Sequence, residues 1–103
     1  MIKITREQLR IINTILAIHA PGVEARAFGS RVNGIPKDYS DLDIALIGAA
    51  KLDTAVIGNL REVFEESDIP FRVDIIDWHS ISKEFQKIIL NRYEVLTPSA
   101  NIR

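Results

Sequence analysis

The sequence contains no cysteine. This absence excludes disulfide bonds, thiolate metal sites and cysteine nucleophiles. It also lacks a basic N-terminal stretch followed by an apolar run, and no segment approaches the ~18 apolar residues of a membrane span. We therefore expect a soluble cytoplasmic protein. The two histidines, His19 and His79, have no third ligand in a zinc-binding pattern, so a zinc site is not predicted.

A strong charge of one sign is missing as well. The net charge is −1, from 13 basic and 14 acidic side chains. No global positive field would therefore draw in nucleic acid or a membrane surface. The length of 103 residues predicts one domain spanning residues 1–103, and the hydrophobic fraction of 47% suits a single compact core.

The spacing of apolar residues predicts helices and strands in a regular order. The expected elements are a helix over 5–20, strands over 23–28 and 42–48, a helix over 52–67, a strand over 71–77 and a helix from Ser80 or Ser82 to about Arg92. Thr5 and Gln8 form a capping-box pattern at the first helix. In the last helix, we expect Phe85, Ile88 and Ile89 to face inward. Residues 97–103 are expected to form a tail.

The connections between these elements predict the sheet topology. The helix of about sixteen residues between the second and third strands favours a parallel crossover. The loop over 31–40 has room for one helical turn at its start and favours an antiparallel first pair. We therefore expect an α/β (α+β) fold, in which a small mixed sheet of three strands or slightly more has helices on its apolar face.

The stretch "FGSRVNGIPKDYSDLD" contains the most informative constellation. Ten residues separate Ser30 from Asp41, and Asp43 follows two positions later. Carboxylates at i and i+2 of a strand point the same way, roughly 7 Å apart, and repel unless a cation lies between them. Mg²⁺ prefers such oxygen ligands. Asp74 is expected on the same face, and three acids there allow two metal ions about 4 Å apart, as in nucleotidyl transfer.

Gly29 and Ser30 supply the other half of the constellation. A glycine lets the backbone approach a phosphate closely, and the serine hydroxyl and backbone N–H groups can bind anionic oxygens. Arg31, the next residue, either neutralises phosphate charge or holds the loop. An antiparallel return of the chain would place this phosphate-binding turn beside the two aspartates.

The motifs "AFGSR", "YSDLDIAL" and "FRVDIIDW" together resemble the nucleotidyltransferase superfamily of the DNA polymerase beta type. The similarity covers nearly the whole chain and is strongest to the minimal, stand-alone members. It implies the nucleotidyltransferase fold and a Mg²⁺-dependent transfer of a nucleoside monophosphate, AMP from ATP or another nucleotide, to a hydroxyl. Gly29, Ser30 and Arg31 match the nucleotide-binding motif, and Asp41, Asp43 and Asp74 match the catalytic metal ligands.

The resemblance also implies a partner. Minimal members pair with a small helical-bundle protein of the HEPN class, in some systems as an antitoxin that adenylylates a toxin on tyrosine. Two alternatives remain open: a binding module that neutralises its partner with little catalysis, or a two-subunit enzyme whose helical partner binds a small-molecule acceptor. Asn33 departs from the family pattern, in which many members carry a basic residue there. The sequence shows no separate wall for the acceptor, so we expect another chain to supply it.

Several residues near the motif allow more than one interpretation. Arg26 and Arg72 fall on the acidic face by alternation and could contact a triphosphate or pair with the carboxylates. Tyr39 could stack on a base or be an ordinary loop aromatic. Asp77 is expected to be a cap or loop acid, and Trp78 a core or interface residue.

Overall fold

The computed structural model describes residues 2–97, and every structural statement below concerns that range. The elements, in chain order, are α1 (Arg6–His19), β1 (Glu24–Phe28), α2 (Ser30–Asn33), β2 (Leu42–Ile47), α3 (Thr54–Glu65), β3 (Val73–Asp77), the 3-10 helix η1 (Trp78–Ser80), α4 (Lys83–Asn91) and β4 (Glu94–Thr97). No helix in this part of the chain is long and apolar enough to cross a bilayer.

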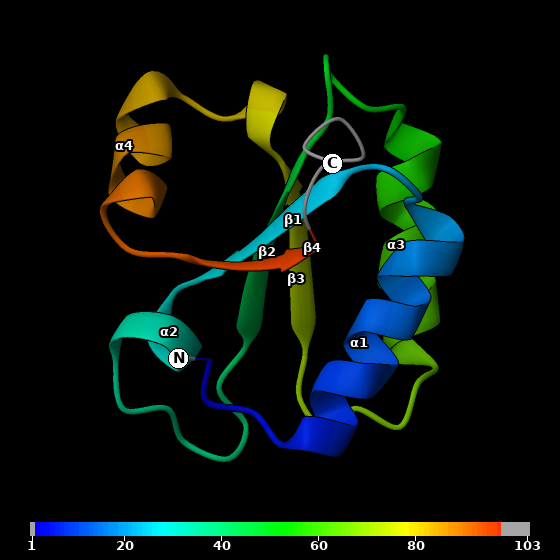
Figure 1. Ribbon diagram of the computed structural model, residues 1–103, viewed down its shortest axis with the longest axis vertical. Helices are drawn as coiled ribbons and strands as arrows, with labels where there is room; N and C mark the ends of the chain where they lie inside the picture. Colours follow the sequence, from blue (N-terminus) through cyan, green and yellow to red (C-terminus); the bar gives the residue numbers. More distant parts are fainter. Residues whose placement is uncertain (1, 98–103) are drawn as a thin grey trace.

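A four-stranded sheet, in the order β3-β2-β1-β4, forms the centre of the molecule (Figure 1). Strands β1 and β2 are antiparallel and β2 and β3 are parallel, which confirms both predicted pairings. The helix between β2 and β3 makes the parallel crossover possible. The fold class is therefore the predicted mixed α/β one.

Strand β4 was not predicted from the sequence. It pairs antiparallel with β1, with Arg26 opposite Val95 and Ala27 opposite Glu94. The expected tail begins at Thr97, which is instead the last residue of this strand, and residues 98–103 lie outside the described range. A four-residue segment carries too few alternating positions to mark a strand, and it is the open edge of β1 that supplies its hydrogen-bond partners.

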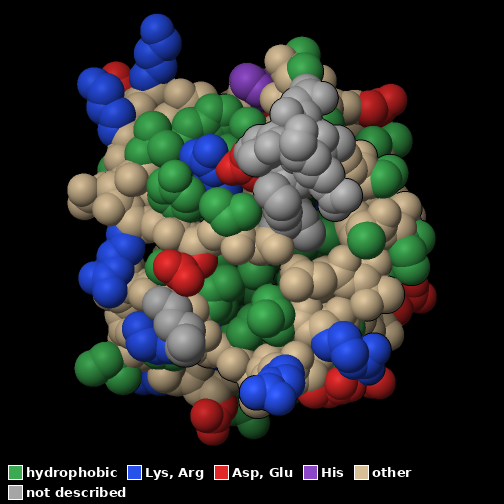
Figure 2. Space-filling view, in the orientation of Figure 1, with side chains coloured by type: hydrophobic (Ala, Val, Ile, Leu, Met, Phe, Trp, Pro, Cys, Tyr) green, Lys and Arg blue, Asp and Glu red, His purple; other side chains and the backbone are tan. Residues whose placement is uncertain are grey.

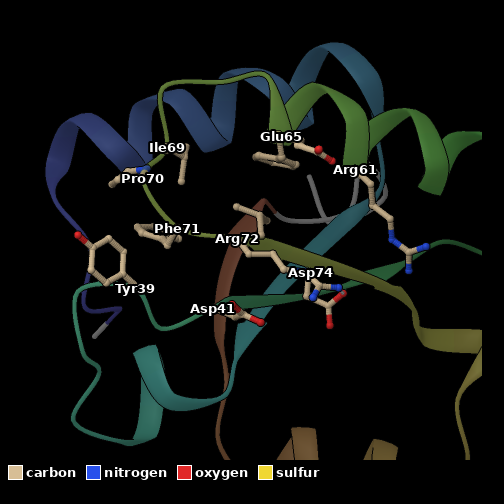
Figure 3. A pocket seen from close by; sticks show the side chains of 11 residues that line it. Tyr39, Asp41, Arg61, Glu65, Ile69, Pro70, Phe71, Arg72 and Asp74 are labelled. Carbon is tan, nitrogen blue, oxygen red and sulfur yellow. Dashed lines mark ion pairs between the residues drawn. The ribbon is translucent and has the colours of Figure 1, made fainter.

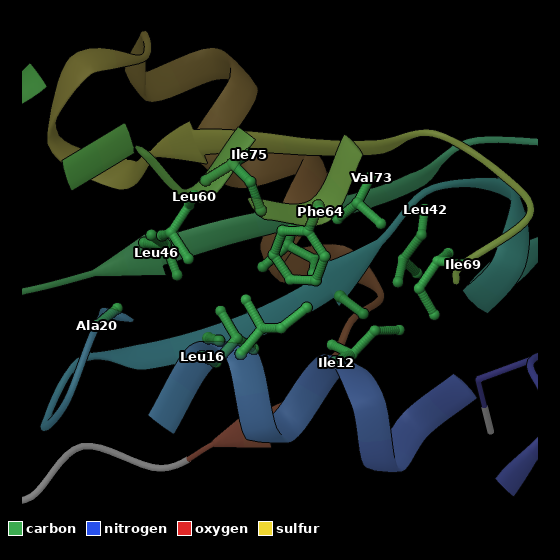
Figure 4. Close-up of a cluster of buried hydrophobic side chains, with 14 of the residues drawn as sticks. Ile12, Leu16, Ala20, Leu42, Leu46, Leu60, Phe64, Ile69, Val73 and Ile75 are labelled. Atoms are coloured by element: carbon green, nitrogen blue, oxygen red, sulfur yellow. The ribbon is translucent and has the colours of Figure 1, made fainter. Parts of the chain in front are cut away.

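The main core lies between the sheet and the two long helices α1 and α3, which cover the same face (Figures 1 and 4). Alternation along β2 places Leu42, Ile44 and Leu46 in this core with no exposed surface. Burying each such side chain contributes about 1.5–3 kcal/mol. The intervening positions of β2 point to the other face of the sheet, and Asp43 is one of them.

Local signals set the helix ends much as predicted. Thr5 and Gln8 form both hydrogen bonds of the capping box at α1. Helix α3 is shorter than the expected 52–67 because the Asp53 side chain accepts from the Ala55 N–H and caps it there. At α4, Ser82 rather than Ser80 is the N-cap, with its hydroxyl accepting from the Phe85 N–H.

Helix α4 corrects the expectation that the helices share one face. The rings of Phe85 on α4 and Phe28 on β1 meet edge to face at 5.8 Å. Phe28 is paired with Asp43, so α4 lies over the polar side of the sheet. Ile89 is fully buried, but Ile88 is 67% exposed, contrary to prediction. Residues 85 and 89 share a helical stripe, and α4 turns that stripe inward, leaving apolar side chains at the surface beside it (Figure 2).

Candidate active site

The turn between β1 and α2 brings backbone against one of the predicted aspartates. Gly29 has a φ of +85°, a conformation that favours glycine. A Cβ added at this position would lie 2.2 Å from Oδ2 of Asp43. Glycine is therefore required twice here, by the backbone angle and by the close approach of the carboxylate. Ser30, the first residue of α2, is exposed directly beside this contact.

The three predicted aspartates lie on neighbouring strands. Asp43 on β2 and Asp74 on β3 are direct partners in the parallel register. Asp41 precedes β2 and points to the same face as Asp43, since the residue between them, Leu42, is fully buried in the core. The structure thus brings Gly29 and the three carboxylates together, as the sequence predicted, although their catalytic roles remain a prediction.

Asp43, which lies between Asp41 and Asp74, is the carboxylate whose ionisation is most disfavoured in this cluster. Burial raises the pKa of Asp43 from its usual 3.8 to about 6, with further contributions from the negative charges of Asp74 and Asp41. Arg72 acts in the opposite direction. Its guanidinium lies 3.9 Å from Asp74 and is 74% exposed, so it neutralises the cluster only weakly.

Within residues 2–97, no group of three His, Cys, Asp or Glu side chains, as they stand, is arranged to hold a metal ion. The donor chemistry nevertheless suits Mg²⁺, because this ion takes oxygen ligands and is often held by only one or two carboxylates together with substrate phosphates. The pKa of Asp43 is raised first by burial and then by the negative charges of Asp74 and Asp41, and a cation bound between these carboxylates would offset both effects. The residues present therefore fit the ion.

Arg31 is buried, and its contacts favour loop support over phosphate binding. Its guanidinium donates to the backbone carbonyls of Lys3, Lys37, Asp38 and Ser40 at 2.8–3.4 Å. It also lies over the ring of Phe71, 3.8 Å from the centroid. Burial lowers the pKa of this guanidinium. Because Arg31 follows Ser30 and Ser40 precedes Asp41, one side chain connects the two ends of the motif.

Arg26 and Arg72, the two other arginines of this face, differ in how closely their side chains are held by neighbouring residues. Arg26 forms an ion pair with Glu24 and lies 4.6 Å from the ring centroid of Tyr93 and 5.8 Å from that of Trp78. It is therefore held in a local cluster away from the aspartates. Trp78 is half-buried beside Arg26 and is not part of the hydrophobic core, so its role as a core or interface residue stays a prediction. Arg72 has its side chain free to reach a ligand.

Asp77 has the capping role that the sequence indicated. Its carboxylate accepts from the N–H groups of Leu52 and His79 and from the hydroxyl of Ser80. It lies on the core side of β3, opposite in direction to Asp74, so it takes no part in the acidic cluster. These bonds join the end of β3 to the segment that leads into α3.

Sequence reasoning missed a cavity beside the aspartates. It has a volume of about 660 Å³ and lies at the outer edge of β3. Its lining residues come from the 39–41 loop, α3, the 69–72 loop and β3: Tyr39, Asp41, Arg61, Phe64, Glu65, Ile69, Pro70, Phe71, Arg72, Val73 and Asp74 (Figure 3). The sequence feature that could have indicated this cavity is the pair of polar residues Arg61 and Glu65, which lie one turn apart on α3.

A mixed sheet that presents three carboxylates beside a Gly-Ser turn is the arrangement of a nucleotidyl-transfer enzyme. Residues 11–100 match the family model described as polymerase beta, nucleotidyltransferase. The chain is also 46% identical over 93 residues to the probable protein adenylyltransferase MntA of Haemophilus influenzae, which covers 90% of this chain and 82% of that protein. The chain therefore belongs to the polymerase beta nucleotidyltransferase family.

Solved structures agree with this fold. One similar chain comes from a toxin–antitoxin complex with AMP-PNP; it has a TM-score of 0.75 and 24% identity, and the match covers 90% of this chain and 75% of that one. Another comes from the complex of a tri-AMPylated Shewanella oneidensis HEPN toxin with MNT antitoxin. It has a TM-score of 0.71 and 24% identity, and the match covers 93% of this chain and 74% of that one. At such identity, these likenesses show the fold alone.

Proposed function

We propose that this protein transfers AMP from ATP to a tyrosine hydroxyl on a helical-bundle toxin, and so acts as an antitoxin. The observation that carries the proposal is the contact of the Gly29 backbone with Asp43, beside Asp41 and Asp74. The turn that we propose to bind phosphates thus lies against Asp43, the central member of the acidic cluster. The 46% identity to a probable protein adenylyltransferase supports both the nucleotide and the reaction.

Each group has a proposed role in the transfer. Asp41 and Asp43 would hold Mg²⁺, with Asp74 contributing to a second ion. When bound, the ions neutralise the developing charge on the phosphates. Ser30 and the N–H groups of its turn orient the leaving phosphates. Arg31 keeps this turn and Asp41 at a fixed spacing through its bonds to the loop carbonyls.

The proposed chemical step is an in-line displacement at the α-phosphorus. The acceptor oxygen forms a new bond to this phosphorus as the bond to the bridging oxygen of the β-phosphate breaks. Pyrophosphate leaves with the electron pair of that bond. Asp74 takes the hydroxyl proton, since it is the carboxylate at the outer side of the cluster.

The partner is proposed from the relatives. Structurally similar chains come from toxin–antitoxin complexes, one of them with a tri-AMPylated HEPN toxin. The alternatives are a binding module with little turnover and a two-subunit enzyme whose partner binds a small acceptor. The cluster favours catalysis over binding alone, because three like charges on one face destabilise a fold that has no use for them. The cytoplasmic location stays a prediction from the sequence.

The test is to incubate the protein with a helical partner encoded beside it, ATP and Mg²⁺, and to measure intact masses of both chains. We expect the partner to gain the mass of one or more AMP groups, and Asp43→Asn to abolish the gain. A complex that forms without any mass change on the partner, with no nucleotide able to produce one, would favour the binding module. Labelling of a free small molecule instead would favour the two-subunit enzyme.

A further inference from the structure

A second cavity adjoins the one beside the aspartates. It has a volume of about 550 Å³ and is enclosed by the N-terminal segment, the start of α1 and two loops. Tyr39, Pro70 and Phe71 line both cavities, and Figure 3 shows these three residues grouped away from Asp74. Within residues 2–97, the lining of the second cavity includes none of the three clustered aspartates. It is therefore a neighbour of the candidate active site and is separate from it.

The charge of the second cavity is opposite to that of the acidic cluster. Its charged lining residues are Lys3, Arg31 and Lys37 against the single acid Asp38. Arg31 donates to the carbonyls of Lys3 at 3.0 Å and of Lys37 at 3.4 Å, so the segments that carry the two lysines meet at its guanidinium. Both lysines are exposed. Three cations against one acid in a single hollow favour an anionic ligand.

Arg31 is a buried cation whose charge no ion pair balances. It is only 5% exposed, and each of its hydrogen bonds goes to a neutral backbone carbonyl. Among the described residues, the ion pairs involve other arginines. Burial lowers the pKa of this guanidinium, and the charge of Asp38 acts in the opposite direction. A buried charge is costly without a counter-ion, and an anion in the adjoining cavity would offset that cost.

The apolar side of the second cavity offers a surface for a planar ring. Tyr39 is 81% exposed, and Pro70 belongs to the same lining. The loop that carries Tyr39 is fixed, because its carbonyls accept three hydrogen bonds from Arg31 and the Ser40 hydroxyl accepts one from the Lys37 N–H. An aromatic ring on a fixed loop loses little conformational freedom when a base stacks on it.

We propose that the second cavity binds a nucleoside monophosphate at a site separate from the acidic cluster. The phosphate lies between Lys3 and Lys37, Arg31 adds its charge from beneath, and the base stacks on Tyr39. Charged side chains bind the phosphate oxygens directly, so this binding needs no Mg²⁺. A volume of about 550 Å³ suits a ligand of this size. The inference goes beyond the proposed transfer reaction and does not depend on it.

The first experiment measures binding in EDTA, which removes the divalent ions that nucleotide binding at the aspartates requires. AMP, adenosine and inorganic phosphate are each titrated into ¹⁵N-labelled protein. We expect AMP to shift the amide signals of residues 3–8 and 37–39. It should bind at least about tenfold more tightly than adenosine or phosphate, because only AMP contacts both the lysines and Tyr39.

A free nucleotide and the 5′ end of a single-stranded RNA present the same chemistry, a phosphate beside a base. A 5′-phosphorylated adenosine trinucleotide, titrated in the same way, distinguishes these two sources. Tighter binding of AMP than of the trinucleotide identifies the free nucleotide as the ligand. Tighter binding of the trinucleotide identifies the end of a strand, with the same residues shifted.

Variants then test the residues that carry the assignment. Lys37→Glu should weaken AMP binding at least about tenfold, and Lys37→Arg should retain most of the affinity. Tyr39→Ala should weaken AMP about tenfold and leave the affinity for inorganic phosphate unchanged, because it removes the ring and no charge. Lys87→Glu is the matched control, since it reverses an exposed lysine on α4, outside the cavity. Asp41→Asn combined with Asp43→Asn should bind AMP in EDTA at least as tightly as the unmodified protein.

The outcomes separate this inference from the proposed function. If AMP binds no more tightly than adenosine and phosphate, or if Lys37→Glu and Lys87→Glu lower its affinity equally, the inference is overturned. Loss of AMP binding in the double aspartate variant would place the nucleotide at the acidic cluster and would overturn it as well. If AMP binds as expected but the partner is never adenylylated, the second site stands and the proposed transfer is wrong.

Discussion

Replacing Asp43 with asparagine should make the protein more stable in the absence of Mg²⁺ and nucleotide. Burial and the charges of Asp74 and Asp41 raise the pKa of Asp43 from 3.8 to about 6. Its ionised form is therefore held less favourably in the folded state than in the unfolded chain. Asparagine occupies nearly the same volume and carries no charge at any pH.

The size of the effect follows from the pKa. A rise from 3.8 to about 6 corresponds to roughly 3 kcal/mol of lost stability once the group is fully ionised. Partial exposure and solvent screening reduce this, so we expect Asp43→Asn to gain about 1–2 kcal/mol at pH 7.5. For a domain of this size, each kcal/mol raises Tm by roughly 4–8 °C.

The pH dependence has a definite sign. Below pH 3.8, Asp43 is protonated in both the folded and unfolded states, so it contributes no difference between the two proteins. As pH rises from 3.8 through 6, the unfolded chain loses the proton first, and the folded state of the unmodified protein becomes progressively less stable than that of Asp43→Asn. The stability gap should therefore open over this window and remain constant above about pH 7.

Urea denaturation followed by circular dichroism at pH 4, 5, 6 and 7.5 measures the gap. Asp68→Asn, which changes an exposed aspartate outside the cluster, is the matched control and should shift stability by less than about 0.5 kcal/mol at every pH. Equal stability of Asp43→Asn and the unmodified protein at pH 7.5, or a gap that does not change between pH 4 and 7.5, would refute the electrostatic argument. Adding Mg²⁺ with an ATP analogue should stabilise only the protein that retains Asp43.

Three further substitutions test the turn and its support. Gly29→Ala should lower the free energy of unfolding by about 1–3 kcal/mol in urea denaturation and abolish nucleotide binding measured by calorimetry. The positive φ is strained for alanine, and the new Cβ would collide with the Asp43 carboxylate. An alanine variant with normal binding would contradict the close contact. Ser30→Ala should slow AMP transfer roughly 10- to 1000-fold at unchanged Tm; a lowered Tm at the normal rate per folded molecule would instead make Ser30 structural. Arg31→Met should lower the free energy of unfolding by roughly 2–4 kcal/mol, since three loop carbonyls and that of Lys3 lose their donor; little or no loss would show that the loop keeps its conformation without Arg31.

Local rules were sufficient for much of the fold and for the position of the acidic site. The alternation of "DLD" fixes Leu42 in the core and turns both aspartates to the other face, whatever packs against them. The capping box at Thr5 depends only on residues three apart. The parallel pairing of β2 and β3 follows from a connection long enough to contain a helix. The first two of these properties are set by backbone geometry within a short span of chain, and the third by the length of one connection.

Other properties were decided only by segments that meet in space. Residues 94–97 become a strand because β1 offers them an unpaired edge, and Ile88 faces solvent because α4 packs through Phe85 and Ile89. From the sequence, Arg31 could have bound phosphate or held the loop. In the structure it is enclosed by carbonyls of a loop up to nine residues away and by the carbonyl of Lys3, 28 residues earlier in the chain.

The pKa of Asp43 and the cavity beside the acidic cluster were likewise decided only by the tertiary structure. The sequence by itself determined which residue types lie on each face, because side-chain direction repeats along a strand. It did not determine how far Asp43 is desolvated or how α3 and the 69–71 loop enclose space beside Asp74, because burial and electrostatic energy depend on distances between parts of the chain that only folding brings together.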